Sequence, residues 1–159
     1  MTSRLYAEET DAIVIGAGPV GLFSVFALGM AGLKCHVVDA LESLGGQLIA
    51  LYPEKPIYDI PGFPRIQAAE LIDRLIEQAV PFTPHYHLRA QVESLARQPD
   101  GRWLAGMSDG RSLLAPVVMI AAGAGAFGPN RPPLEGIERY EGNSVLYLVR
   151  NRDAFTGFI

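Results

Sequence analysis

Residues 13–21 read IVIGAGPVG, and residues 37–39 read VVD. The first stretch predicts a strand, a glycine turn and the start of a helix, and the second predicts another strand that ends in an acid. Gly16 suits the tight turn, Gly18 allows a pyrophosphate to approach the backbone, and Gly21 allows the helix to pack close to the strand. The pattern therefore predicts a dinucleotide-binding unit with the phosphates at the N-terminus of the helix.

Two further residues refine this site. Pro19 lies inside the same motif, and we count it with the three glycines among the cofactor-binding residues. Asp39 ends the second strand, where a carboxylate accepts hydrogen bonds from a ribose diol and repels a phosphate on that ribose. The adenosine diphosphate moiety of FAD or NAD is expected to fit here, and that of NADP is expected to fit poorly.

Length and composition are those of one globular domain. The chain has 159 residues, of which 49% are hydrophobic, and its formal net charge is −4. The chain has no basic patch of the kind that binds nucleic acid. It also has no apolar run of about 18 residues, the length that would predict a membrane span. We therefore expect a cytoplasmic protein. The single cysteine, Cys35, lies in the second predicted strand, which favours a buried hydrophobic role over a reactive thiol.

The remainder of the chain predicts the rest of an α/β fold. Residues 67–79 have helical periodicity, and the turn sequences at 99–101 and 108–110 predict an antiparallel β-meander. The apolar run at residues 116–122 predicts a central parallel strand that is buried on both faces. We expect a three-layer, Rossmann-like domain, whose mostly parallel sheet carries the meander as an insertion.

The segment at residues 52–64 allows two interpretations. Its four prolines exclude a regular helix, which is compatible with a surface loop. Its interleaved aromatic and aliphatic residues favour a loop that lines a flat ligand.

Candidates for acid–base or metal chemistry are few. His85 and His87 alternate on one predicted strand, a spacing that suits a metal, but no third ligand is near them in the sequence. Ordinary exposed or hydrogen-bonded histidines are therefore favoured, and we predict no metal site and no catalytic side chain. Flavin chemistry is compatible with this, because the cofactor carries the electrons and the protein orients it.

Four segments together resemble one family. They read GAGPVG at residues 16–21, GGQLIALYPEK at 45–55, IYDIPGFP at 57–64 and AGAGAF at 122–127. This pattern resembles the N-terminal FAD domain of the thioredoxin-reductase-like ferredoxin–NADP reductases of bacteria, from Asp11 to about Gly157.

The resemblance implies roles for individual residues. Asp39 corresponds to the acid on the adenosine ribose of FAD, Gln47 to the glutamine beside the flavin, and Tyr52 to the aromatic residue that stacks on the isoalloxazine ring. Val92 corresponds to the strand residue whose backbone meets the adenine, and Phe127 to a phenylalanine near the cofactor. The full set of expected cofactor-binding residues is Gly16, Gly18, Pro19, Gly21, Asp39, Gly46, Gln47, Tyr52, Val92, Gly123 and Phe127.

The resemblance also implies a reaction. Members transfer a hydride from NADPH to FAD and then pass electrons to ferredoxin or flavodoxin, and a homodimer is among the expectations. We interpret residues 1–159 as an incomplete FAD-binding domain, which ends near 150–159 where members enter the NADPH-binding domain, so that the chain alone is expected to be inactive. The absence of a CxxC pair excludes dithiol–disulfide exchange. The alternatives are a non-catalytic flavin- or NAD-binding module and another disulfide-free flavin reductase or monooxygenase.

Overall fold

The computed structural model describes residues 7–125 and 132–147. Four parallel strands form the central sheet in the order β10-β2-β3-β6. Their bounds are Val117–Ile120, Ala12–Ile15, Cys35–Asp39 and His85–Leu88. Helix α1 (Pro19–Met30) connects β2 to β3, as parallel neighbours require a crossover connection.

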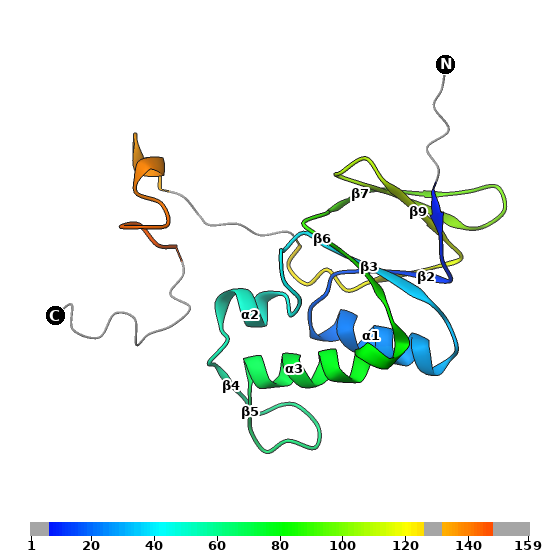
Figure 1. Ribbon diagram of the computed structural model, residues 1–159, viewed down its shortest axis with the longest axis horizontal. Coiled ribbons are helices and arrows are strands. Elements are labelled where there is room, and N and C mark those ends of the chain that lie inside the picture. Colours follow the sequence, from blue (N-terminus) through cyan, green and yellow to red (C-terminus); the bar gives the residue numbers. More distant parts are fainter. Residues whose placement is uncertain (1–6, 126–131, 148–159) are drawn as a thin grey trace.

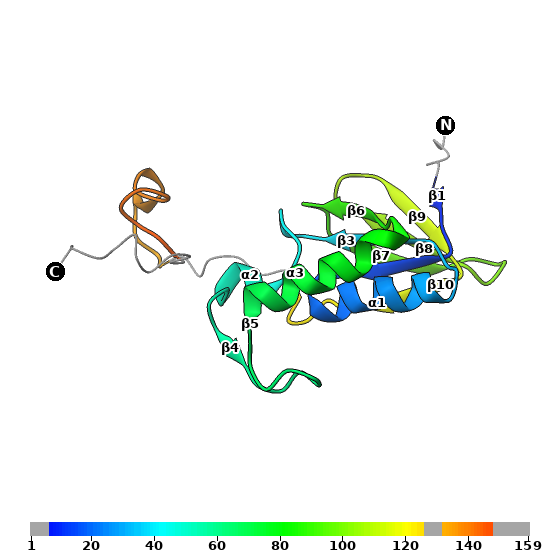
Figure 2. The ribbon, with the colours of Figure 1, turned by 60° about the horizontal axis from the view of Figure 1, so that its bottom comes forward.

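A second sheet has the order β1-β9-β8-β7. Its strands are Glu8–Glu9, Ser112–Ala115, Trp103–Met107 and Val92–Arg97, and β7, β8 and β9 are antiparallel neighbours. The predicted β-meander is confirmed. Figures 1 and 2 show three layers, with helices on one face of the central sheet and the meander on the other.

Helices α1 (Pro19–Met30) and α3 (Ala68–Ala79) pack against each other under the central sheet. Helix α1 begins with Pro19 and ends before Gly32, whose φ of 75° suits the residue after a helix C-cap. The remaining elements are the short helix α2 (Gln47–Leu51), the hairpin of β4 (Pro56–Ile57) and β5 (Ile66–Gln67), and the 3₁₀ turns η1 (Val80–Phe82) and η2 (Ile137–Arg139).

The central sheet is buried on both faces through alternation along its inner strands. On β2, Val14 belongs to the core that faces α1 and α3, and Ile13 belongs to the core that faces the meander. Val37 and Val38 divide in the same way on β3. The continuous apolar runs of these strands are explained by this double burial.

The expectation for residues 116–122 was wrong in one respect. Strand β10 is parallel to β2 as predicted, but it lies at the edge of the sheet, and its end residues Val117 and Ile120 are 40% and 73% exposed. An apolar run is buried on both sides only where neighbouring strands pair with both of its edges. Among the described residues, no further strand pairs with the outer side of β10.

Candidate functional site

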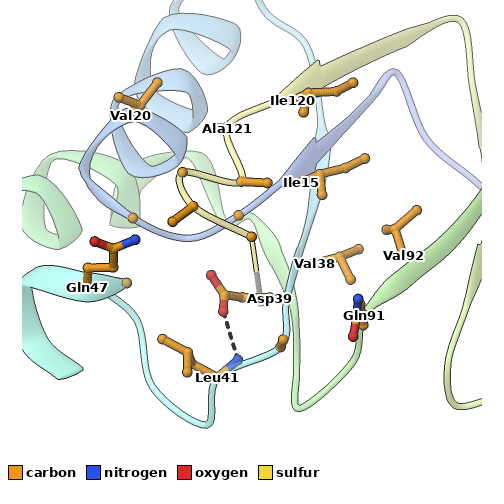
Figure 3. A pocket seen from close by; sticks show the side chains of 18 of the residues that line it. Ile15, Val20, Val38, Asp39, Leu41, Gln47, Gln91, Val92, Ile120 and Ala121 are labelled. Carbon is orange, nitrogen blue, oxygen red and sulfur yellow. Dashed lines mark hydrogen bonds between the residues drawn. The ribbon is translucent and has the colours of Figure 1, made fainter. Parts of the chain in front are cut away.

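The main cleft lies at the carboxyl ends of β2, β3 and β10, where ligands bind in open parallel sheets. Its volume is about 850 Å³. Figure 3 shows side chains from these strands, from α1 and from α2 converging on it. Eight of the expected cofactor-binding residues line it: Gly16, Gly18, Pro19, Asp39, Gly46, Gln47, Val92 and Gly123.

The three glycines of the first turn have different surroundings. A Cβ on Gly16 would lie 2.4 Å from the Ala121 carbonyl oxygen, and φ at Gly16 is 104°. A Cβ on Gly21 would lie 1.9 Å from the Gly16 carbonyl oxygen, so Gly21 packs behind the turn and does not line the cleft. A Cβ on Gly18 would meet nothing within 4 Å. Gly18 is therefore the position where a ligand can approach the backbone.

Asp39 is held by the backbone around it. Its Oδ2 accepts a hydrogen bond from the Ala17 amide at 2.6 Å, and its Oδ1 accepts one from the Leu41 amide at 2.8 Å, the bond that is dashed in Figure 3. The carboxylate thus fixes the glycine turn before any ligand binds. It is the only ionisable side chain among the described residues that line the cleft.

Two other segments complete the rim. Gly46 precedes α2 with φ of 58°, and its Cβ would lie 3.0 Å from the Gly18 Cα, so α2 begins against the first turn. The Gln47 side-chain amide lies 3.8 Å from where a Cβ of Gly123 would be. The glutamine therefore faces the turn that follows β10, as Figure 3 shows.

The apolar walls of the cleft were not anticipated from motifs. Ile15, Val38 and Ile120 are at or next to the carboxyl ends of their strands, and Val20 and Gln91 add to the lining. The rule that ligands bind beyond the carboxyl ends of parallel strands would have indicated the strand-end residues.

Besides Gly21, two expected residues are not among the lining residues. Tyr52 follows α2, is 48% exposed, and has the Lys55 ammonium 5.3 Å from its ring centroid. Its stacking on a flavin stays a prediction. Phe127 lies outside the described residues. A second, smaller hollow is lined by Leu48, which also lines the main cleft, and by residues 55–59 of the proline-rich segment.

The histidines lie apart from the cleft. His36, which no sequence motif indicated, joins His85 and His87, and His36 Nδ1 is 2.9 Å from His87 Nε2. Burial, together with the neighbouring Arg111 guanidinium, lowers the pKa of His87 to about 4, and burial lowers the pKa of His36. Cys35 is buried as predicted, and burial raises the pKa of its thiol, which makes it a poor nucleophile.

Comparison with known proteins finds sequence relatives over most of the chain. A scan against protein-family models finds no match. The chain is 64% identical over 150 residues to a ferredoxin–NADP reductase of Paramagnetospirillum magneticum and 62% identical over 152 residues to one of Rhodospirillum rubrum. Each match covers 94% of this chain and 44% of the relative. These matches show that the chain is similar in sequence to ferredoxin–NADP reductases over less than half of their length.

Solved structures of other proteins share this fold. The thioredoxin reductase of T. acidophilum superimposes with a TM-score of 0.62 at 19% identity, over 84% of this chain and 40% of that one. Cyclohexanone monooxygenase from Rhodococcus sp. Phi1, solved with NADP⁺, gives 0.64 at 24% identity, over 86% and 30%. These likenesses confirm the Rossmann-like fold class. Among the described residues, no helix is long and apolar enough to cross a membrane.

Proposed function

We propose that the main cleft binds the adenosine diphosphate moiety of FAD. The observation that supports this most directly is the open space at Gly18, at the start of α1 and beside the Asp39 carboxylate. The first amides of a helix have no partner within the helix, and with the helix dipole they favour a pyrophosphate. Since no cationic side chain lines the described cleft, backbone donors are left to hold the phosphates.

Asp39 favours an unphosphorylated ribose. Two backbone amides occupy part of its acceptor capacity, and an ionised carboxylate offers about four acceptor positions. The remaining positions accept hydrogen bonds from ribose hydroxyls, whereas a phosphate on the ribose would be repelled. FAD and NAD are therefore favoured over NADP in this cleft.

The flavin end is assigned to Gln47 and Tyr52. Gln47 lines the cleft at the start of α2, and the half-exposed Tyr52 is the residue that directly follows this short helix. An exposed aromatic face is suited to stacking on a flat heterocycle. Val92 lies at the start of β7, on the side of Asp39 away from Gln47, and we infer that its backbone meets the adenine.

The reaction that we propose is that of ferredoxin–NADP reductases. The chain spans less than half the length of the curated relatives that it matches. We infer that it supplies their FAD-binding part, in the cytoplasm, and that the complete enzyme accepts a hydride from NADPH and passes electrons to ferredoxin or flavodoxin, with a homodimer as one assembly. Bound FAD supplies the electron chemistry, and the cleft residues orient it.

A ligand titration tests the binding proposal. The purified 159-residue chain is titrated with FAD, FMN, NAD and NADP, followed by flavin or tryptophan fluorescence. We expect FAD to bind more tightly than FMN, because only FAD has the adenosine end that the glycine turn and Asp39 recognise. Equal affinity for FMN would contradict the assignment of the adenosine site, and preference for NAD over FAD would favour a non-catalytic NAD-binding module.

A further inference from the structure

All three histidines of the chain meet at one place in the fold. His36 on β3 is the register partner of His85 on β6, and His87 lies two residues further along β6 on the same face. Ring centroids are 4.8 Å apart for His36 and His85, and the rings of His85 and His87 stack with an angle of 2°. The sheet therefore gathers imidazoles that the sequence separates.

An acid from the other sheet completes the group. Glu8 on β1 places its Oε1 3.8 Å from His36 Nε2. One ligand atom each from Glu8, His36 and His85 lies within 4.8 Å of the others. With bonds of about 2.1 Å, tetrahedral zinc ligands are about 3.4 Å apart. The ligand atoms therefore have to come closer together to hold a zinc ion. Glu8 and His85 are exposed, so their side chains can move inward while the buried His36 ring stays fixed.

We propose that Glu8, His36 and His85 form a binding site for a divalent transition-metal ion of the Zn²⁺ type. Two imidazoles and one carboxylate are a ligand set that such ions accept, with a water in the fourth position. The site is separate from the cofactor cleft, since His36 precedes Asp39 by three residues on β3, about 10 Å along the strand. A bound ion would tie β1 of the meander sheet to the central sheet.

The hydrogen bonds around His36 set a condition on this site. Arg111 can only donate, so His87 Nδ1, 2.9 Å from its Nη1, must accept, and the neutral His87 ring then carries its proton on Nε2. His87 Nε2 donates to His36 Nδ1, which leaves the His36 proton on Nε2. That proton occupies the position of the metal.

Metal binding therefore requires both rings to change tautomer. His36 then donates from Nδ1 to His87 Nε2, and His87 carries its proton on Nδ1, with no net proton released. Such a hydrogen bond from the second nitrogen is the usual support of a metal-bound histidine. The Arg111 guanidinium has to turn away from His87, which its partly exposed side chain permits. Arg111 thus opposes the metal, so removing it should strengthen binding.

The test is a Zn²⁺ titration of the 159-residue chain, prepared without a histidine tag, against a chromophoric chelator. We expect one Zn²⁺ per chain and a rise in the thermal unfolding midpoint with Zn²⁺ concentration. His85→Asn and Glu8→Gln should each weaken binding roughly tenfold or more. Glu9→Gln is the matched control, because Glu9 is adjacent on β1 and pairs with Arg102 instead; it should leave the affinity unchanged.

The arginine distinguishes this site from adventitious binding to a surface histidine. Arg111→Gln should tighten Zn²⁺ binding several-fold, because the glutamine amide oxygen can accept a hydrogen bond from the Nδ1–H of His87. Arg97→Gln, at an exposed position, should not change the affinity. Nitrogen chemical shifts of the imidazoles should show His36 changing tautomer as Zn²⁺ is added. Unchanged affinity in His85→Asn or Glu8→Gln, or weaker binding in Arg111→Gln, would overturn the proposal.

Discussion

Gly18 caps the N-terminus of α1 and Gly21 lies in its first turn, and the two residues have different surroundings. Gly18 opens onto the cleft, while Gly21 is pressed against the carbonyl of Gly16. The same substitution should therefore affect two different properties at the two positions. This separates the residue that admits a ligand from the residue that holds the helix against the strand.

Gly18→Ala should reduce FAD affinity about tenfold or more, since the new methyl group occupies the approach of the pyrophosphate. The φ of −71° at Gly18 is accessible to alanine, so the free energy of unfolding should fall by no more than about 1 kcal/mol, the scale of an altered helix N-cap. Fluorescence titration and chemical denaturation measure the two quantities. Undiminished FAD affinity would place the pyrophosphate elsewhere.

Gly21→Ala should instead lower the free energy of unfolding, by about 1 to 3 kcal/mol. In a helix interior, alanine is normally favoured over glycine by about 1 kcal/mol, so only the contact with the Gly16 carbonyl reverses the sign. Urea denaturation of the ligand-free chain gives the value. A stabilised variant would show that α1 can move away from β2 at little cost.

Asp39→Asn should destabilise the chain even without a ligand. Both carboxylate oxygens accept backbone hydrogen bonds, and an amide must turn its NH₂ group toward one of these donors. We expect a loss of about 1 to 3 kcal/mol in unfolding free energy and a similar loss in FAD binding. Asp59→Asn, at an exposed position, is the control for lost charge. A loss of binding with unchanged stability would mean that the backbone contacts contribute little.

Tyr52→Ala should brighten the fluorescence of bound FAD and weaken binding by about 0.5 to 1.5 kcal/mol, because a stacked phenol ring quenches the flavin and adds contact energy. Tyr58→Ala provides the control, as Tyr58 is 65% exposed in the neighbouring hairpin segment. If the emission of bound FAD is the same in both variants and the wild type, Tyr52 does not stack on the flavin.

At the scale of elements, α1 is positioned by what its glycines contact. The helical pattern expected after the glycine turn includes Val20 and Phe23, but the structure leaves both exposed and buries Leu22, Val25 and Leu28. Gly21 fixes this rotation at the start of the helix. Near its end, Gly29 receives the Phe82 ring of η1, 2.1 Å from the position of a glycine Cβ.

Gly29→Ala should therefore loosen the contact between α1 and η1. The added methyl group would displace the Phe82 ring, which also packs edge-to-face on Phe26 at 5.9 Å. We expect the free energy of unfolding to fall by about 1 to 3 kcal/mol, as for overpacking. The double variant with Phe82→Leu should recover part of this loss, and an equal loss with and without Phe82 would assign the effect to another neighbour.

At the scale of the whole molecule, residues 7–125 and 132–147 contain one strand–glycine–helix cradle of the type that holds a dinucleotide. With FAD bound, this chain by itself should not reduce ferredoxin or a dye with NADPH. Hydride transfer requires the nicotinamide about 3 to 3.5 Å from the flavin, and such positioning supplies roughly 7 to 11 kcal/mol of the barrier.

The rate of ferredoxin or dye reduction by NADPH is measured in steady-state assays with excess FAD. The assays are run with and without the remaining part of a relative, supplied as a second chain. The relative's own full-length enzyme is the positive control. Saturable NADPH turnover by the 159-residue chain alone would reveal a nicotinamide site within it.

The sequence alone determined the local features of this protein. The glycine spacing, the acid at position 39 and the period of residues 67–79 each reflect constraints within one element or one turn, so the cradle, α3 and the meander could be predicted. Tertiary structure decided the features that depend on neighbours. The exposure of β10 follows from its place at the sheet edge, and the rotation of α1 follows from the contact at Gly21.

The histidine cluster shows most clearly which features depend on the tertiary structure. His85 and His87 could be paired from their spacing, but His36 and Glu8 reach them only through parallel pairing of β3 with β6 and through the stacking of two sheets. Residues that are distant in the chain become neighbours only when sheet order and register are fixed. Sequence spacing carries no information on that order, which is why the tertiary structure alone assembled this site.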